Sequence, residues 1–359
     1  MHRFAFVIHP IKPKDAARKY PIAQYMPDWL IEKFYGRKKP FIGSYIKGIE
    51  SKTGEKTEGL FIICPLTPDM MLHKLPLEAV YEKLIYCSEL AKSEGAEIMG
   101  LGAFTSVVGD GGITVAKNSP IAITTGNSYT IATAIQGALK ACAQIGIDPS
   151  TATLAVVGAT GSIGRTCARM LSPHFQHTIA VGRDRERTEA VAAECVRGTA
   201  SIDVSSIRAA DVIITVTSAG ADLIFPEHLK PGAIVCDVAR PRDVSVKVAN
   251  ERPDVLVIEG GVVAVPGDVD FGMSFGFPPK TAFACMSETM MLALEGKIEN
   301  FTLGKDVSVE QVEETIRLAD KHGFELAGFR AFEREVGEEA FERARAALRT
   351  RSDATKASV

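Results

Sequence analysis

Apolar residues in the middle of the chain form short runs that alternate with stretches of helical spacing. Between residues 151 and 265, five such runs have the length of buried strands: residues 153–157, 178–181, 212–215, 233–237 and 255–258. Short continuous apolar runs separated by helical segments are typical of parallel strands that helices cover on both faces. The pattern therefore predicts an α/β fold with a Rossmann-type, doubly wound parallel sheet in this region.

The residues on either side of this region show other patterns. Residues 1–127 mix strand-like runs, such as residues 4–9 and 60–65, with a helix predicted over residues 77–93. We expect residues 1–127 to form an N-terminal α/β domain that binds the substrate. Residues 128–265 would form the Rossmann domain with its entry helix, and residues 266–359 a C-terminal helical region with a charged tail. In this last region, helices are predicted over residues 280–295, 309–322 and 329–349.

A glycine-rich turn directly follows the first strand of the predicted Rossmann sheet. It reads Gly158-Ala159-Thr160-Gly161-Ser162-Ile163-Gly164 and leads into a helix. Glycines at this spacing allow a tight turn and let backbone N–H groups approach a pyrophosphate, which the helix N-terminus attracts. The strand–turn–helix context favours a dinucleotide site over an ordinary surface turn.

The end of the second strand indicates which dinucleotide binds. An NAD site usually has an acidic residue at this point to hold the ribose 2′-hydroxyl, whereas this chain has Arg183, with Arg185 and Arg187 close behind. A guanidinium can bind a 2′-phosphate through two parallel hydrogen bonds. Asp184 is the competing feature in favour of NAD, but we expect it at the start of the next helix. The cofactor predicted here is NADPH.

Composition and charge narrow the functional class. With 46% hydrophobic residues and a net charge of −3, the chain is predicted to be globular and not to bind nucleic acid. No apolar run approaches the length of a membrane span, so no integral membrane association is expected. The seven cysteines are scattered without a CxxC pair, which predicts neither a disulfide framework nor a metal site and favours a cytoplasmic location.

One of these cysteines stands in a context that favours reactivity. Cys285 follows Pro278 and Pro279, which places it within the first two turns of the helix predicted there. The helix dipole and the nearby Lys280 would favour the thiolate, which is the form that attacks acyl carbonyls. Buried packing is the commoner role of a cysteine. These residues alone leave packing and catalysis open.

Short sequence blocks in a fixed order resemble one known family. The blocks are GLGAFTS at residues 100–106, TGN at 125–127, VVGATG at 156–161, EGGVV at 259–263, FACMSETMML at 283–292, LEG at 294–296, NF at 300–301 and HGF at 322–324. Over roughly residues 1–328 the chain is similar to the long-chain fatty acyl-[acyl carrier protein] reductases, which are best known from cyanobacteria.

The resemblance implies a reaction and a set of roles. It implies NADPH-dependent reduction of a fatty acyl thioester, carried by acyl carrier protein or by CoA, to a fatty aldehyde. Cys285 would be the nucleophile that forms an acyl-enzyme, and Gly158, Gly161 and Gly164 would form the phosphate loop. Arg183 would contact the 2′-phosphate.

Other positions complete the expected site. Backbone donors around Ser106 or Asn127 are expected to stabilise the oxyanion. Tyr129 stands where the family pattern has a histidine, and its phenol is expected to replace that proton donor. The segment after residue 263 also departs from the pattern, which puts the acyl-chain length and the carrier in doubt more than the type of reaction.

Partners and alternative functions remain open at this point. A basic run at residues 33–39 could dock an acidic carrier protein, and an aldehyde-consuming enzyme could act as a further partner. One alternative is an NADP-dependent dehydrogenase of the shikimate or amino-acid type, which would transfer hydride directly without Cys285. A second alternative is a non-catalytic protein that senses NADP(H).

Overall fold

The structure is a computed structural model, and it describes residues 1–18, 20–274 and 276–357. The chain forms two compact units. Unit 1 comprises Met1–Gly126, Ala264–Lys305 and Glu314–Glu325, and unit 2 comprises Asn127–Val263, Asp306–Glu313 and Leu326–Val359. Residues 266–359 are thus divided between the two units. No helix in the described part of the chain combines the length and the apolar character that crossing a membrane requires.

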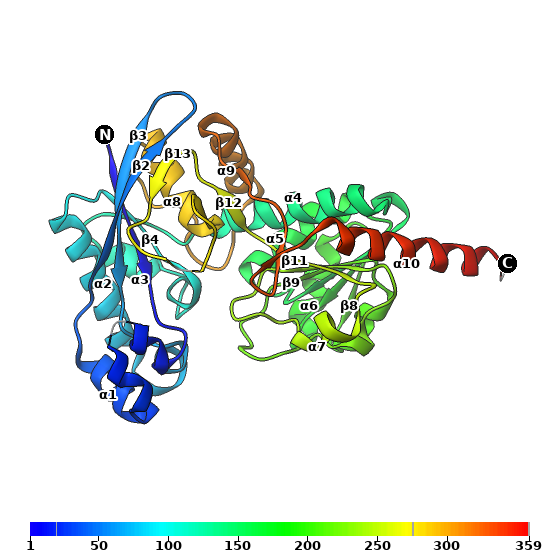
Figure 1. The fold of residues 1–359 in the computed structure, drawn as a ribbon, viewed down its shortest axis with the longest axis horizontal. Coiled ribbons are helices and arrows are strands. Elements are labelled where there is room, and N and C mark those ends of the chain that lie inside the picture. Colours follow the sequence, from blue (N-terminus) through cyan, green and yellow to red (C-terminus); the bar gives the residue numbers. More distant parts are fainter. Residues whose placement is uncertain (19, 275, 358–359) are drawn as a thin grey trace. The chain divides into compact units, whose positions relative to one another are not determined.

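Unit 1 is built on a six-stranded mixed sheet with the order β13–β2–β3–β1–β4–β5 (Figure 1). The strands β3, β1, β4 and β5 run parallel to one another, whereas β2 is antiparallel to both β3 and β13. Their bounds are β1 (Arg3–Ile8), β2 (Phe41–Glu50), β3 (Lys56–Ile63), β4 (Ile98–Gly100), β5 (Ala122–Thr124) and β13 (Gly267–Asp270). The strands predicted near residues 4–9 and 60–65 are confirmed.

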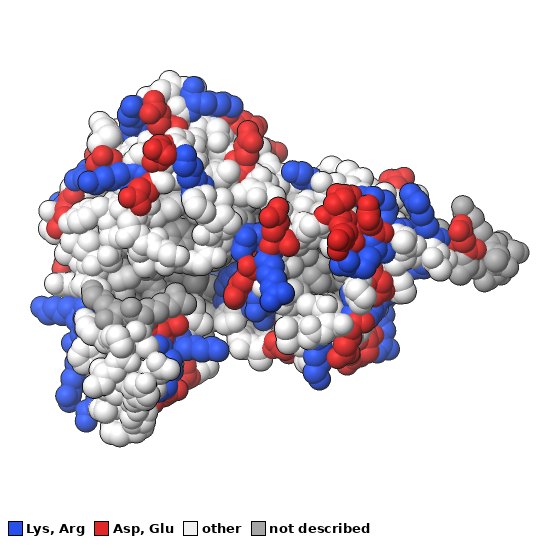
Figure 2. All heavy atoms as spheres, in the orientation of Figure 1, with Lys and Arg blue, Asp and Glu red and all other residues white. Residues whose placement is uncertain are grey.

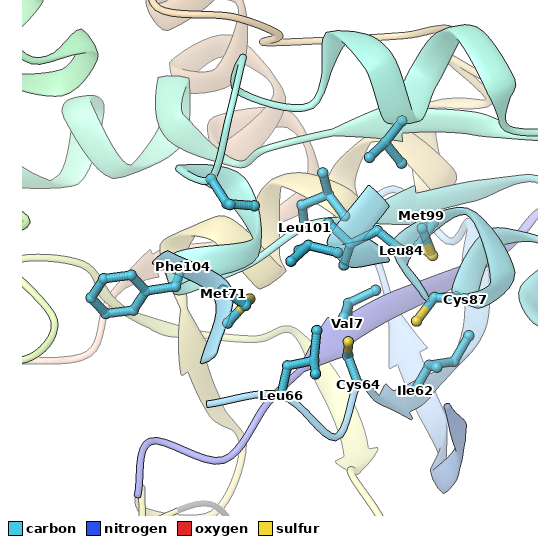
Figure 3. Close-up of a cluster of buried hydrophobic side chains, with 14 of the residues drawn as sticks. Val7, Ile62, Cys64, Leu66, Met71, Leu84, Cys87, Met99, Leu101 and Phe104 are labelled. Atoms are coloured by element: carbon cyan, nitrogen blue, oxygen red, sulfur yellow. The ribbon is translucent and has the colours of Figure 1, made fainter. Parts of the chain in front are cut away.

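Different elements cover the two faces of this sheet. On one face, apolar side chains of β1, β3 and β4 pack with α2 (Leu77–Ser93) into a buried cluster that includes Val7, Ile62, Leu84 and Met99 (Figure 3). Helix α8 (Ala284–Glu295) contacts β1, β3 and β4 but contributes no residue to that cluster. Successive side chains of a strand point to opposite faces, so α8 covers the other face. The remaining helices that include residues of unit 1 are α1 (Asp28–Arg37), α3 (Ile113–Asn118) and α9 (Val309–His322).

Unit 2 contains the predicted parallel sheet (Figure 1). Its strand order is β11–β10–β9–β6–β7–β8, and every neighbouring pair is parallel. The bounds are β6 (Thr153–Val157), β7 (His177–Val181), β8 (Gly198–Ser201), β9 (Val212–Thr215), β10 (Ile234–Asp237) and β11 (Leu256–Glu259). The five predicted strands are confirmed. The sixth, β8, reads GTAS and lies at the sheet edge, so its sequence has no apolar run.

Helices on both faces complete the Rossmann-type arrangement. Helix α4 (Asn127–Ile145) contacts β9, β10 and α5 (Ser162–Leu171), and α5 also contacts α6 (Arg185–Glu194). On the other face, residues of β6, β7, β9 and β10 pack with α7 (Val246–Glu251) and the 3-10 turn Val204–Ala209. The doubly wound α/β fold predicted from the sequence is therefore confirmed.

Two predicted helices begin later than expected. The helix predicted over residues 280–295 starts at Ala284, because β14 (Thr281–Phe283) precedes it. In place of a helix from residue 329, β16 (Arg330–Ala331) and β17 (Arg334–Glu335) form a hairpin, and α10 (Glu338–Ala357) starts after it. Phe332 and Glu333 turn the hairpin with positive φ angles of 50° and 67°, which a helix does not allow. The short strands β12 (Val262–Ala264) and β15 (Glu325–Leu326) lie where the chain passes between the units.

Candidate active site

The glycine turn of unit 2 has the geometry of a phosphate loop. Gly158 has a φ of +84°, and a Cβ atom added there would lie 2.6 Å from the carbonyl oxygen of Val216. A Cβ atom on Gly164 would lie 2.2 Å from the carbonyl oxygen of Gly158, so the first turn of α5 packs directly on the loop. At Gly161, the N-cap of α5, an added Cβ would meet only the oxygen of Gly158, at 3.3 Å. The backbone of the loop is therefore not covered by side chains at Gly161.

These features fit the pyrophosphate of a dinucleotide. The first backbone N–H groups of α5, including those of Ser162 and Ile163, lack acceptors within the helix and lie at the positive end of its dipole. Ala159 donates its N–H to Val181, which fixes the loop against β7. A helix N-terminus after a glycine loop is a site where a phosphate group binds.

The three arginines after β7 are separated by the structure. Arg183 is exposed just beyond β7, and in the described part of the chain it forms no ion pair. Arg185 lies 3.8 Å from Glu189 on the same helix, and Arg187 donates to the carbonyl oxygen of Thr160 in the glycine loop. Asp184 is the N-cap of α6, as predicted, because its carboxylate accepts the N–H of Arg187. Arg183 is thus the arginine best available to a 2′-phosphate.

Two buried aspartates fix the loops at the carboxyl ends of β9 and β10. Asp237 accepts the N–H groups of Ala239, Asp243 and Val244, and burial raises its pKa to about 6. Asp243 in turn accepts hydrogen bonds from the Thr215 and Thr217 hydroxyls at 2.5 Å each. Ligands of open α/β sheets bind at this edge of the sheet. Asp237 therefore holds the backbone at this edge of the sheet.

Cys285 differs from the other six cysteines in its exposure. It is partly exposed, whereas each of the others is buried. It is the second residue of α8, so it lies in the first turn of that helix, where the macrodipole stabilises an anion. Lys280, which the sequence suggested as a nearby cation, forms an ion pair with Asp268 at 2.9 Å. Lys280 is thus paired with Asp268, and Cys285 lies at the start of α8.

The structure brings the TGN turn against this cysteine. Gly126 has a φ of +75°, and a Cβ atom added there would lie 2.3 Å from both Cα and Cβ of Cys285. Glycine is therefore required at position 126 for its backbone angle and for its closeness to the cysteine. Gly126 and Cys285, which are 159 positions apart in the sequence, thus meet within unit 1.

A buried hydrogen-bond network holds this turn in place. The hydroxyl of Thr124 donates to the Glu288 carboxylate at 2.5 Å, and both residues are fully buried. Glu288 lies one helical turn after Cys285. The hydroxyl of Thr125 donates to the carbonyl oxygen of Thr302 at 2.5 Å. No motif in the sequence points to Thr124 or Glu288, although a glutamate among the apolar residues of a helix is an available signal.

The other expected catalytic residues have separate positions. Ser106 lies in the 3-10 helix Ala103–Ser106 of unit 1, and its hydroxyl donates to the carbonyl oxygen of Ala103. Asn127 and Tyr129 lie in the first turn of α4 in unit 2, with exposed fractions of 7% and 1%. Asn127 directly follows Gly126 in the chain. Ser106 therefore has its own backbone partner, and the Tyr129 ring is part of a core.

A partly buried histidine, His9, lies directly after the end of β1. The Nδ1 atom of His9 is 3.1 Å from the carbonyl oxygen of Pro10, and its Nε2 accepts the N–H of Phe104 at 3.3 Å. Burial lowers the pKa of His9 below its ordinary value. A neutral ring that donates from Nδ1 satisfies both bonds. His9 thus anchors the loop that carries Ser106.

The described residues form no cluster of metal ligands, and unit 1 has a shallow hollow. Within the described residues, no group of three or more His, Cys, Asp or Glu side chains is placed to hold a metal ion. A shallow hollow of about 640 Å³ in unit 1 is lined by Glu97, Ala122 and Asn300, among others. It opens at the amino ends of β4 and β5, which is the edge of the sheet opposite to Gly126.

Comparisons with known proteins relate the chain to oxidoreductases. The profile of the shikimate / quinate 5-dehydrogenase family matches residues 141–259, which lie entirely within unit 2. The long-chain acyl-[acyl-carrier-protein] reductase of Synechococcus elongatus is 28% identical over 327 residues, covering 87% of this chain and 94% of that protein.

A further relative is similar to most of this chain. Aminotransferase PigE of Serratia sp. is 34% identical over 286 residues, or 77% of this chain, and this chain spans only about a third (33%) of its length. The crystal structure of L-tryptophan dehydrogenase from Nostoc punctiforme covers 99% of this chain and 89% of its own, with 11% identity and a TM-score of 0.43, which supports no functional comparison. The dehydrogenase profile and the Synechococcus reductase together relate this chain to the NAD(P)-dependent oxidoreductases.

Proposed function

We propose that this chain reduces a fatty acyl thioester to the corresponding aldehyde with NADPH, through an acyl group carried on Cys285. The observation that carries the proposal is the contact of Gly126 with Cys285. Cys285 is the cysteine that is not buried. It lies at the N-terminus of α8 and beside the glycine turn at Gly126. The reductase that covers most of this chain is named for this substrate class, which supports the choice of an acyl thioester.

The chemistry on Cys285 would proceed in two stages. In the first stage, the thiolate attacks the carbonyl carbon of the substrate, and the bond to the carrier's sulfur breaks as that thiol leaves with a proton. Backbone N–H groups at the start of α8 lack intrahelical acceptors and would stabilise the negative charge on the carbonyl oxygen. The product of this stage is an acyl-enzyme thioester.

In the second stage, the acyl-enzyme is reduced and released. NADPH bound at the glycine loop would supply the hydride to the carbonyl carbon. The carbon–sulfur bond to Cys285 then breaks, which releases the aldehyde and regenerates the thiolate. In sum, one thioester, one NADPH and one proton give one aldehyde, one thiol and one NADP⁺.

The roles of the remaining predicted residues follow from their positions. Arg183 would bind the 2′-phosphate, since it is exposed at the end of β7 and has no ion-pair partner there in the described chain. Tyr129 would need access to the substrate to donate a proton, and its burial makes a role in positioning Asn127 the better proposal. Ser106 would act through its backbone, since its hydroxyl bonds to Ala103. An acyl carrier protein or CoA would deliver the acyl group, and a separate enzyme would consume the aldehyde.

Replacement of the cysteine tests the covalent route. The protein is incubated with NADPH and a long-chain acyl carrier protein or acyl-CoA, and aldehyde and acyl-enzyme are measured by mass spectrometry. Cys285→Ala should abolish both products and leave NADPH binding unchanged. Cys195→Ala is the matched control, because Cys195 is only 8% exposed and should leave activity intact. Full aldehyde formation by Cys285→Ala would refute the covalent mechanism.

The cofactor assignment has its own test. Arg183→Ala should raise the KM for NADPH at least tenfold and leave the KM for NADH unchanged, since only NADPH carries the 2′-phosphate. Equal effects on both cofactors would contradict the assignment. The shikimate/quinate dehydrogenase profile covers only the cofactor-binding unit, so it leaves the substrate of this chain open.

A further inference from the structure

A concentration of exposed apolar side chains lies near the start of unit 1. Among the described residues, sixteen large hydrophobic side chains are exposed, and residues 11–34 contribute seven of them. This segment is only one fifteenth of the chain, so the concentration exceeds ordinary surface scatter. We call these seven side chains the aromatic patch: Ile11, Tyr20, Ile22, Tyr25, Trp29, Leu30 and Phe34.

The segment that carries the aromatic patch is anchored to unit 1. Residues Ile31 and Tyr35 of α1, four positions apart, are buried in the core of unit 1. Leu30 and Phe34, also four positions apart, are exposed on another side of the same helix. The Lys14 ammonium donates to the carbonyl oxygen of Gln24 at 3.0 Å, which ties the preceding turns together. The apolar side chains are therefore presented outward from a packed scaffold.

Basic residues accompany the patch. Residues 11–39 contain eight Lys or Arg and three Asp or Glu, a net charge of +5, so the rest of the chain carries −8 of the total of −3. The Lys38 ammonium lies 4.8 Å from the ring centre of Tyr20 and 5.5 Å from that of Phe34. Figure 2 shows the lower end of unit 1, where α1 lies in Figure 1, as a broad uncharged surface with Lys and Arg along its left margin and Asp and Glu along its right margin.

We infer that the aromatic patch binds the surface of an anionic lipid bilayer. Tryptophan and tyrosine prefer the interface between lipid and water, where one end of the ring is apolar and the other is wet. Basic residues beside them are attracted to anionic headgroups, and a helix with Trp, Phe and Leu beside Lys and Arg binds in the plane of that interface. The local charge of +5 on an otherwise acidic protein is complementary to an anionic surface.

A bilayer fits this surface better than an acidic carrier protein does. In a protein–protein interface, a few anchor residues usually carry most of the binding energy, and lysine is depleted from the interface core. Here the exposed apolar side chains come from Ile11, from the 3-10 turn Pro21–Tyr25 with the residue before it, and from α1, and Lys33, Arg37 and Lys38 are close to them in the sequence. A fluid lipid surface can accept such scattered side chains without matching pockets.

Trp29 provides a direct measurement, because it is the only tryptophan of the chain and is 63% exposed. The full-length protein is titrated with vesicles of phosphatidylcholine alone or of phosphatidylcholine with one third phosphatidylglycerol. Only the anionic vesicles should shift Trp29 emission to shorter wavelength and sediment the protein, and brominated acyl chains should quench the emission. Raising the salt concentration to about 0.5 M should weaken binding, since the charges are exposed.

Paired variants test which side chains bind the vesicles. Ile22→Asp should reduce the affinity for anionic vesicles at least tenfold, and Lys33→Ala should reduce it about fivefold. Val246→Asp and Lys56→Ala are the matched controls, because both residues are exposed but lie outside the segment, and they should bind as the unmodified chain does. Cys285→Ala should also bind normally, so loss of the proposed activity and loss of vesicle binding are separate results.

Three results would overturn the inference. One is equal binding to neutral and anionic vesicles, and another is normal vesicle binding by Ile22→Asp. The third is a blue shift of Trp29 on adding purified acyl carrier protein, or on concentrating the protein alone, with no response to vesicles. That outcome would assign the aromatic patch to a protein partner or to a second copy of the chain.

Discussion

Replacing Gly126 with alanine tests whether the TGN turn positions Cys285. The new Cβ atom would lie 2.3 Å from Cα and Cβ of Cys285, whereas carbon atoms that are not bonded settle about 3.5–4.0 Å apart. The turn and the start of α8 must therefore separate by more than about 1 Å. A misplacement of about 1 Å in an active site can cost a hundredfold in rate. The φ of +75° adds a backbone strain of about 1–2 kcal/mol for any residue with a Cβ atom.

Gly54→Ala provides the matched control for this variant. Gly54 also belongs to unit 1 and has a φ of +94°, but an added Cβ atom would meet nothing within 4 Å. Both variants should lose about 1–2 kcal/mol in the free energy of urea unfolding through the backbone strain alone. Only Gly126→Ala should slow single-turnover acylation of Cys285, by about a hundredfold or more. If folded Gly126→Ala acylates as fast as Gly54→Ala, the turn does not position the nucleophile.

Three further predictions concern buried polar groups. Glu288→Gln should lower the rate of acylation about tenfold by weakening the bond from Thr124, and Thr124→Ser, which keeps the hydroxyl, should lower it far less. Because the pKa of Asp237 is raised to about 6, its contribution to stability is full below pH 3.8 and is lost as the pH rises through 6. In urea unfolding, the free energy of unfolding of Asp237→Asn should therefore rise by up to ~3 kcal/mol relative to that of the wild type between pH 4 and 7. A difference in free energy that stays constant over this pH range would contradict the prediction. Ser51→Ala should cost about 1–3 kcal/mol in thermal unfolding, because it removes the 2.9 Å partner of the buried His322 ring; an unchanged Tm would refute this.

The sequence predicted elements well where apolar runs and breakers agreed. The strand Thr153–Val157 and the helix Val309–His322 have the predicted limits. Prediction failed where tertiary pairing replaced local preference. Residues 330–335 carry apolar positions at helical spacing, yet they form a hairpin, with Phe329 and Phe341 packed together at a ring distance of 5.7 Å. The edge strand β8 has no apolar pattern that would predict it. It is a strand because its backbone pairs with β7.

The candidate cofactor loop and the candidate nucleophile differ in how far the sequence alone determined them. The glycines of the candidate phosphate loop could be recognised from the sequence, because strand, turn and helix follow one another within the nineteen residues 153–171 and their geometry is local. By contrast, the residues around Cys285 favoured buried packing and left catalysis open. Its contact with Gly126 and the buried bond between Thr124 and Glu288 arise only when β5 and α8 pack together.

The sequence by itself thus determined the class of fold and the glycine turn with Arg183 beyond it, which are the candidates for the phosphate loop and the 2′-phosphate contact. These depend on the order of neighbouring residues and on backbone geometry. The tertiary structure decided which of seven cysteines is accessible, which turn contacts it, and which apolar side chains stay outside the core. Burial and contact are relations between segments far apart in the chain, and a local pattern carries no information about the partner that packing will supply.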